Sequence, residues 1–122
     1  MKWIGLLAIS LTAACTHPCK EVNTNQRIKA KIVRITCASK VIQVLDSNYY
    51  YLGETWTRKG EPDTTYLHVA KVLNTCDMPD TLKEENEFYF RIIPENEANN
   101  NCVVCEMYDF PPNKGIYIKV VK

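Results

Sequence analysis

The stretch that decides the fold is residues 27–37, RIKAKIVRITC. In its first half, basic residues alternate with the apolar set Ile28, Ala30 and Ile32. Such alternation predicts a β-strand with one buried face. From the next residue onward the apolar positions are Val33, Ile35 and Cys37. A shift of one residue within a continuous strand pattern predicts a β-bulge, which bends the strand so that its two halves serve different parts of a curved sheet.

Working outward, short strand patterns recur and no long helix is expected. Further strands are predicted at residues 41–45, 49–52, 66–73, 88–92 and 116–121. Turn residues, or loops rich in Asn, Asp, Gly and Pro, separate them. The pattern favours an all-β fold: a small antiparallel barrel of five to six strands, similar to the oligonucleotide/oligosaccharide-binding (OB) fold. A β-sandwich is the alternative, although the immunoglobulin type has more strands and a Cys-Trp-Cys spacing that is absent here.

The first fourteen residues, MKWIGLLAISLTAA, predict a cleavable export signal. One lysine precedes a short apolar run and then small residues, which is the layout of a secretory signal. A transmembrane helix needs roughly 20 apolar residues, so this run is too short to remain as an anchor. A signal of this length is short for plain secretion and usual for a lipoprotein.

Cys15 is expected to carry a lipid. Residues 12–15, TAAC, resemble the lipobox of bacterial lipoproteins, although Thr12 stands where Leu is commonest. Two alternatives remain: plain secretion with Cys15 in a disulfide, and a cytosolic protein with a buried N-terminal helix. On the lipoprotein interpretation, residues 15–25 are a short tether, residues 26–122 are the β domain, and the membrane is the partner of the anchor. The protein is then exported to the bacterial cell envelope, on its periplasmic or surface face.

The chain has six cysteines. With Cys15 lipidated and Cys19 in the tether, the disulfide candidates are Cys37, Cys76, Cys102 and Cys105. In an oxidising compartment, disulfides are the expected state of such residues. The pair in the segment CVVC is expected to join Cys37 and Cys76 rather than to close on itself. A redox pair would need its first cysteine at a helix N-terminus, and a zinc site would need a second close pair.

Composition and motifs argue against several functions. Removing residues 1–14 takes away one lysine and leaves equal numbers of basic and acidic residues, so no nucleic-acid partner is expected. The candidate nucleophiles Ser39 and Ser47 lack a nucleophile-elbow pattern, and His17 and His68 lie in the tether and in a strand. There is no glycine-rich phosphate loop and no metal-ligand spacing. We therefore expect no catalytic residue, no cofactor and no metal.

Aromatic residues gather in the middle of the chain. The candidate ligand-binding residues are Tyr49, Tyr51, Trp56 and Tyr66. They are interpreted in three ways: as ordinary packing, as a stacking platform for a sugar or peptide, or as an interface with another envelope protein. An envelope protein and a glycan are thus the expected classes of partner.

A resemblance accompanies these patterns. It rests on the lipobox-like start, Cys37 followed by VIQVLD at 41–46, NCVVC at 101–105, Pro111-Pro112, and IYIKVVK at 116–122. Together they look like a group of small lipoproteins of Bacteroidota and span most of the mature chain. The resemblance implies an envelope location and no particular activity, so no functional residue is carried over from it.

Overall fold

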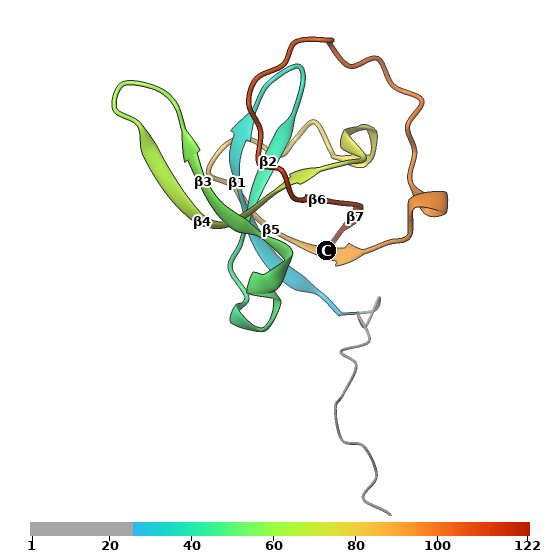
Figure 1. The fold of residues 1–122 in the computed structure, drawn as a ribbon. Helices are drawn as coiled ribbons and strands as arrows, with labels where there is room; N and C mark the ends of the chain where they lie inside the picture. Colours follow the sequence, from blue (N-terminus) through green and yellow to red (C-terminus); the bar gives the residue numbers. More distant parts are fainter. Residues whose placement is uncertain (1–25) are drawn as a thin grey trace, which may run out of the picture.

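A computed structural model describes residues 26–122 of the chain. Cys15, the signal segment 1–14 and the tether 15–25 lie outside the described residues. The described part consists of strands and three short 3₁₀-helices (Figure 1). The strands are β1 (Ile28–Ile35), β2 (Lys40–Val44), β3 (Glu54–Arg58), β4 (Thr64–Val72), β5 (Glu87–Ile92), β6 (Gly115–Ile116) and β7 (Ile118–Val121). The helices are η1 (Ser47–Leu52), η2 (Thr75–Asp77) and η3 (Glu95–Glu97).

All strands belong to one sheet, with the order β3-β4-β2-β1-β5-β7 and with β6 paired to β4. Every pairing is antiparallel except that of β4 with β6, which is parallel. The all-β prediction is confirmed, with seven strands rather than five or six. Within the described residues the sheet is not closed into a barrel, because the last strand is interrupted at Tyr117: β6 pairs with β4, and only β7 pairs with β5.

The predicted bulge in β1 is confirmed. Ile32 pairs with Ile42 and Arg34 pairs with Val41, so Val33 is the extra residue. Successive residues of a regular strand point to opposite faces. Since Ile42 and Val41 are neighbours, Ile32 and Arg34 lie on opposite faces although they are two residues apart.

The bulge changes which side chains share a face. Val33 and Arg34 both lie on the face opposite to Ile32, and Ile35 returns to the face of Ile32. The expectation that Val33 and Ile35 share a face is therefore wrong. The bulge places two consecutive residues, Val33 and Arg34, on the same face, so that the alternation restarts one residue later. The carbonyl of Val33, which the bulge removes from the ladder, accepts a hydrogen bond of 3.1 Å from Nη1 of Arg58.

The sheet carries an apolar cluster on each face. The larger cluster contains Ile28, Ile32, Ile42, Phe88, Phe90 and Ile118 among its buried members. The smaller cluster is formed by Val33, Val41 and Val69, with Trp56 and Tyr66 packed against it. Val41 and Ile42 are adjacent in β2, so the two clusters lie on opposite faces. We call the face of the smaller cluster the outer face.

Residues 49–52 form part of helix η1 rather than the expected strand. The side chain of Asp46 accepts a hydrogen bond from the backbone N–H of Asn48, and its carbonyl accepts one from Tyr49. This cap stabilises a helical turn, which overrides the preference of tyrosine for strands. β3 then begins at Glu54 and forms with β4 a hairpin that extends away from the rest of the sheet (Figure 1).

The C-terminal strand is fastened by a buried side chain. Asn74 is fully buried, its Nδ2 donates to the carbonyl of Ile118, and its Oδ1 accepts from the N–H of the same residue. The amide side chain thus occupies the place of a neighbouring strand for one residue. Among residues 26–122, no helix has the length and apolar character that a membrane crossing requires.

Candidate functional site

The long loop, residues 98–114, connects η3 to β6 and contains the CVVC segment at residues 102–105. In Figure 1 it is the orange-to-red chain that runs around one side of the sheet. Two disulfides, Cys37–Cys105 and Cys76–Cys102, tie it to the β1–β2 turn and to η2. Each CVVC cysteine therefore pairs with a distant partner, as the sequence favours, and the disulfides indicate an oxidising, extracytoplasmic location.

Polar contacts hold the rest of the long loop against the outer face. Nε1 of Trp56 donates to the carbonyl of Phe110 at 3.0 Å. The backbone N–H of Lys114 donates to Oε1 of Glu54 at 2.8 Å, and its Nζ donates to the carbonyls of Tyr51 and Gly53. The loop is thus attached at several points along its length, which restricts its motion more than either disulfide alone.

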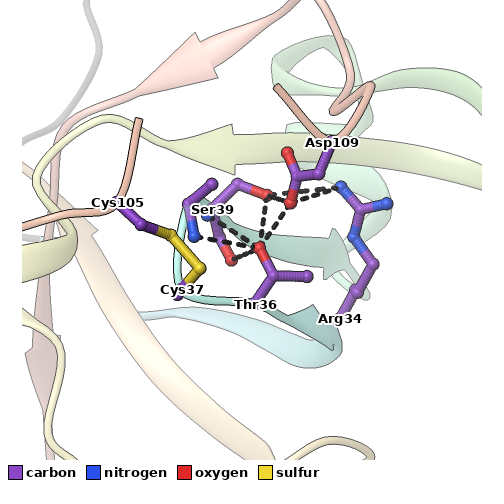
Figure 2. The surroundings of a disulfide bond; sticks show 7 residues. Arg34, Thr36, Cys37, Ser39, Cys105 and Asp109 are labelled. Atoms are coloured by element: carbon purple, nitrogen blue, oxygen red, sulfur yellow. Dashed lines mark hydrogen bonds and ion pairs between the residues drawn. A yellow bond between two sulfur atoms is a disulfide. The ribbon is translucent and has the colours of Figure 1, made fainter. Parts of the chain in front are cut away.

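Asp109 is the centre of the polar network between the long loop and the sheet (Figure 2). Its Oδ2 accepts hydrogen bonds from the hydroxyls of Thr36 and Ser39, the latter at 2.7 Å. The same oxygen lies 3.3 Å from Nη2 of Arg34, which also donates to Ser39 at 3.2 Å. The network lies beside the disulfide of Cys37, so covalent and ionic attachments of the loop coincide.

The ion pair between Arg34 and Asp109 is almost buried, with side-chain exposures of 11% and 12%. Burial raises the pKa of Asp109, but the hydrogen bonds from Thr36 and Ser39 and the positive charge of Arg34 outweigh it and hold the pKa below its usual value. The guanidinium of Arg34 also lies over the ring of Trp56, 4.8 Å from its centroid. Its Nε has no hydrogen-bond partner within the described residues.

Between these attachments the long loop exposes large apolar side chains. Val103 is fully exposed, and Tyr108 and Phe110 are each 69% exposed. Met107 and Val104 are exposed as well. The rings of Tyr108 and Phe110 pack edge to face with centroids 4.8 Å apart, and Phe110 has a positive φ of 53°. A positive φ is uncommon for an aromatic residue, so the attachments maintain a conformation that the chain alone disfavours.

A pocket of about 380 Å³ lies between the long loop and the sheet. Its walls come from the β1–β2 turn, the end of β4, η2 and the long loop, and they include Ser39, Lys71, Thr75, Asn100, Met107 and Tyr108. A second pocket of about 340 Å³ adjoins it and shares Ser39, Cys76, Cys102 and Val104 with it. Volumes of this order suit small-molecule or short-peptide ligands.

The structure places the predicted aromatic residues as two pairs. Tyr49 and Tyr51 have centroids 6.2 Å apart, and Tyr49 packs against the larger core cluster. Trp56 and Tyr66 stack at 6.3 Å on the outer face, where they pack against the smaller cluster. Burial raises the pKa of Tyr49, and the nearby Tyr51 and Asp46 add to this effect. Among residues 26–122, the aromatic residues most exposed to solvent are Tyr108 and Phe110, which the sequence interpretation did not select.

Arg34, Asp109 and Lys71 also line or border this site, although the sequence patterns did not single them out. Arg34 occupies a polar position of the β1 pattern, and only the bulge places it on the outer face. The sequence signal for Arg34 was its position just after the shift in the apolar pattern, where a bulge can change the face on which a side chain lies. Within residues 26–122, no three His, Cys, Asp or Glu side chains lie together in a way that could hold a metal ion.

In comparisons with known proteins, no family model, no curated protein and no solved structure matches this chain.

Proposed function

We propose that the protein is a non-catalytic binding module of the bacterial cell envelope, attached to a membrane by lipid on Cys15, whose long loop binds another envelope protein. The observation that carries the proposal is the loop itself. It is fixed by two disulfides and the Asp109 network, yet it exposes Val103, Tyr108 and Phe110. Tyr108 and Phe110 also contact each other, exposed apolar patches mark interaction sites, and prior fixation reduces the entropy that binding costs.

An OB-like arrangement of the strands supports the placement of the ligand on the outer face. In the sheet, β2 lies between β1 and β4. The C-terminal chain pairs with β4 through β6 and then with β5 through β7. The OB fold is a partly open barrel whose ligands bind on an exposed face of its central strands and on adjoining loops. Here the long loop crosses that face and supplies its most exposed side chains.

The absence of catalysis is part of the proposal. The hydroxyls of Thr36 and Ser39 both donate to Asp109, whose charge is compensated by Arg34. A nucleophilic hydroxyl needs a base that is free to accept its proton. The ring of His68 stacks on Tyr50 at 3.7 Å and takes no part in this network.

A glycan is the alternative ligand, and stacking on Trp56 would be its expected mode of binding. The guanidinium of Arg34 and the ring of Tyr66 both lie against Trp56, which leaves less of its faces for a sugar. This favours a protein ligand. A secreted, unlipidated carbohydrate- or peptide-binding protein is the alternative to the anchored form.

The anchor is tested by mass spectrometry of the membrane fraction. The mature chain should begin at Cys15 and carry acyl mass, and Cys15→Ala should release the protein from the membrane. A chain that begins elsewhere, or that lacks acyl mass, would support the secreted alternative.

The binding surface is tested by site-specific photo-crosslinking in intact cells. A crosslinker at Val103 should yield an adduct with a protein, and the double change Tyr108→Ser/Phe110→Ser should abolish the adduct without a change in circular dichroism. A crosslinker at Glu61, in the β3–β4 turn, is the matched control. An adduct that survives the double change, or that forms equally from Glu61, would contradict the proposal.

A further inference from the structure

Two charged residues line the pocket of about 380 Å³, and only one of them has an ion-pair partner. Asp109 is compensated by Arg34, whereas Lys71 makes no side-chain hydrogen bond or ion pair within residues 26–122. Lys71 is half-buried in β4. It pairs with Val41, so it lies on the outer face that the long loop crosses. Of the two charged residues in the pocket wall, Lys71 is therefore the one whose charge no described residue compensates.

Two uncharged polar side chains in the same pocket also lack partners. Neither the hydroxyl of Thr75 nor the amide of Asn100 makes a side-chain hydrogen bond in the described part of the chain. The rest of the wall combines the aliphatic side chains of Val72, Leu73, Val104, Met107 and Pro111 with Ser39, Tyr108 and the Cys76–Cys102 disulfide. Polar groups placed among apolar side chains are the usual composition of a ligand site.

We propose that this pocket binds the C-terminal residue of a peptide, with its carboxylate on Lys71 and its side chain against Val104 and Met107. A carboxylate is the group that would pair with the uncompensated ammonium, and the half-buried position strengthens such a pair relative to one in water. Thr75 and Asn100 can bond the last peptide unit. The aliphatic side chains in the wall suit an amino-acid side chain better than a polyhydroxylated sugar. This inference rests on the proposed function and names which part of the partner is recognised.

The test uses two probes that differ only in charge. The exported protein, with both disulfides intact, is titrated by calorimetry with N-acetyl-alanyl-leucine and with the C-terminal amide of the same dipeptide. The acid should bind at least about tenfold more tightly than the amide, because hydrogen bonds to charged groups are worth more than neutral ones. Lys71→Gln should remove this preference, and Lys71→Arg should restore part of it.

Lys40→Gln is the matched control, since Lys40 is half-buried and lines the adjoining pocket but not the pocket of Lys71. It should leave the preference for the acid unchanged. Equal binding of acid and amide, no binding of either, or loss of the preference in Lys40→Gln would each overturn the inference. None of these results depends on the crosslinking from Val103. The proposed function is therefore tested separately from this inference.

Discussion

Asp109 joins the long loop to the sheet through a single carboxylate oxygen. If the carboxylate is removed, Arg34 is left nearly buried without its counter-charge. Loss of one partner of a buried pair costs about 3 kcal/mol or more, chiefly because the other charge stays desolvated. Asp109 is therefore the residue through which electrostatics controls the position of the loop.

We expect Asp109→Asn to lower the free energy of unfolding in a pH-dependent way. The pKa of Asp109 is lowered in the folded state, so its charged form stabilises the fold above the unfolded pKa of about 3.9, and this contribution is lost as pH falls through the lower folded pKa. Urea titrations of both proteins should give a difference that is constant above about pH 5 and shrinks below about pH 4.

The control for this prediction is Asp80→Asn. Asp80 is exposed and makes no ion pair or side-chain hydrogen bond within residues 26–122. Its substitution should change the free energy of unfolding by at most about 0.5 kcal/mol at every pH. A difference between wild type and Asp109→Asn that does not shrink in acid would show that the Asp109 charge is not what the network stabilises.

A second residue-scale prediction concerns Asn74, which satisfies both backbone groups of Ile118. Asn74→Ala should leave a buried N–H and a buried carbonyl without partners, at a cost of about 2–3 kcal/mol in the free energy of unfolding. Hydrogen exchange should accelerate at Ile118 and its neighbours in β7. Unchanged exchange there would mean that another group replaces the side chain.

Among the strands, β3 and β4 approach each other closely at Gly53, the residue before β3. A Cβ at Gly53 would lie 2.2 Å from the carbonyl carbon of His68. Gly53→Ala should force β3 away from β4 and destabilise the protein by about 2–3 kcal/mol, measured by thermal or urea unfolding.

Gly60→Ala is the matched control for Gly53→Ala. The nearest atom that its Cβ would meet is 3.7 Å away, and neither glycine has a positive φ. Gly60→Ala should be neutral or slightly stabilising, because alanine lowers the entropy of the unfolded chain. Similar effects of both substitutions would exclude the close approach as the cause.

Most features that depend on neighbouring residues could be predicted from the sequence, whereas features that depend on distant residues could not. Alternation was enough to predict β1 and β5, the apolar run at residues 41–45 predicted β2, and the shift after Ile32 predicted the bulge. The strand expected at residues 49–52 failed because a local cap on Asp46 outweighs residue preference. The Asp109 network could not be predicted, since Thr36 and Asp109 lie 73 residues apart and no local pattern links them.

At the scale of the whole molecule, the two disulfides stabilise loops of different length. Cys37–Cys105 spans 68 residues and Cys76–Cys102 spans 26. On the chain-entropy model, removal of the longer link should cost about 4.4 kcal/mol and of the shorter about 3.5 kcal/mol. Double alanine variants of each pair, compared in urea, should follow this order. The reverse order would show that local contacts outweigh loop length.

The shorter disulfide should matter more for function than its stability contribution suggests. Cys102 lies in the wall of both pockets, and its backbone N–H donates to the sulfur of Cys76. Crosslinking from Val103 should therefore decrease in the Cys76→Ala/Cys102→Ala variant at temperatures where it remains folded. An unchanged adduct would show that the Asp109 network alone positions the loop.

The link between Cys37 and Cys105 also determines how the chain carries a mechanical load. Tension applied at its two ends passes directly through the sulfur bridge, and the residues between the two cysteines form a closed ring that cannot be drawn out. Only the short flanking segments can extend, by at most about 3.5 Å per residue. β2, β3, β4 and β5 lie within the ring, so pulling can peel β1 and β7 from the sheet while most of the pocket wall bears no tension.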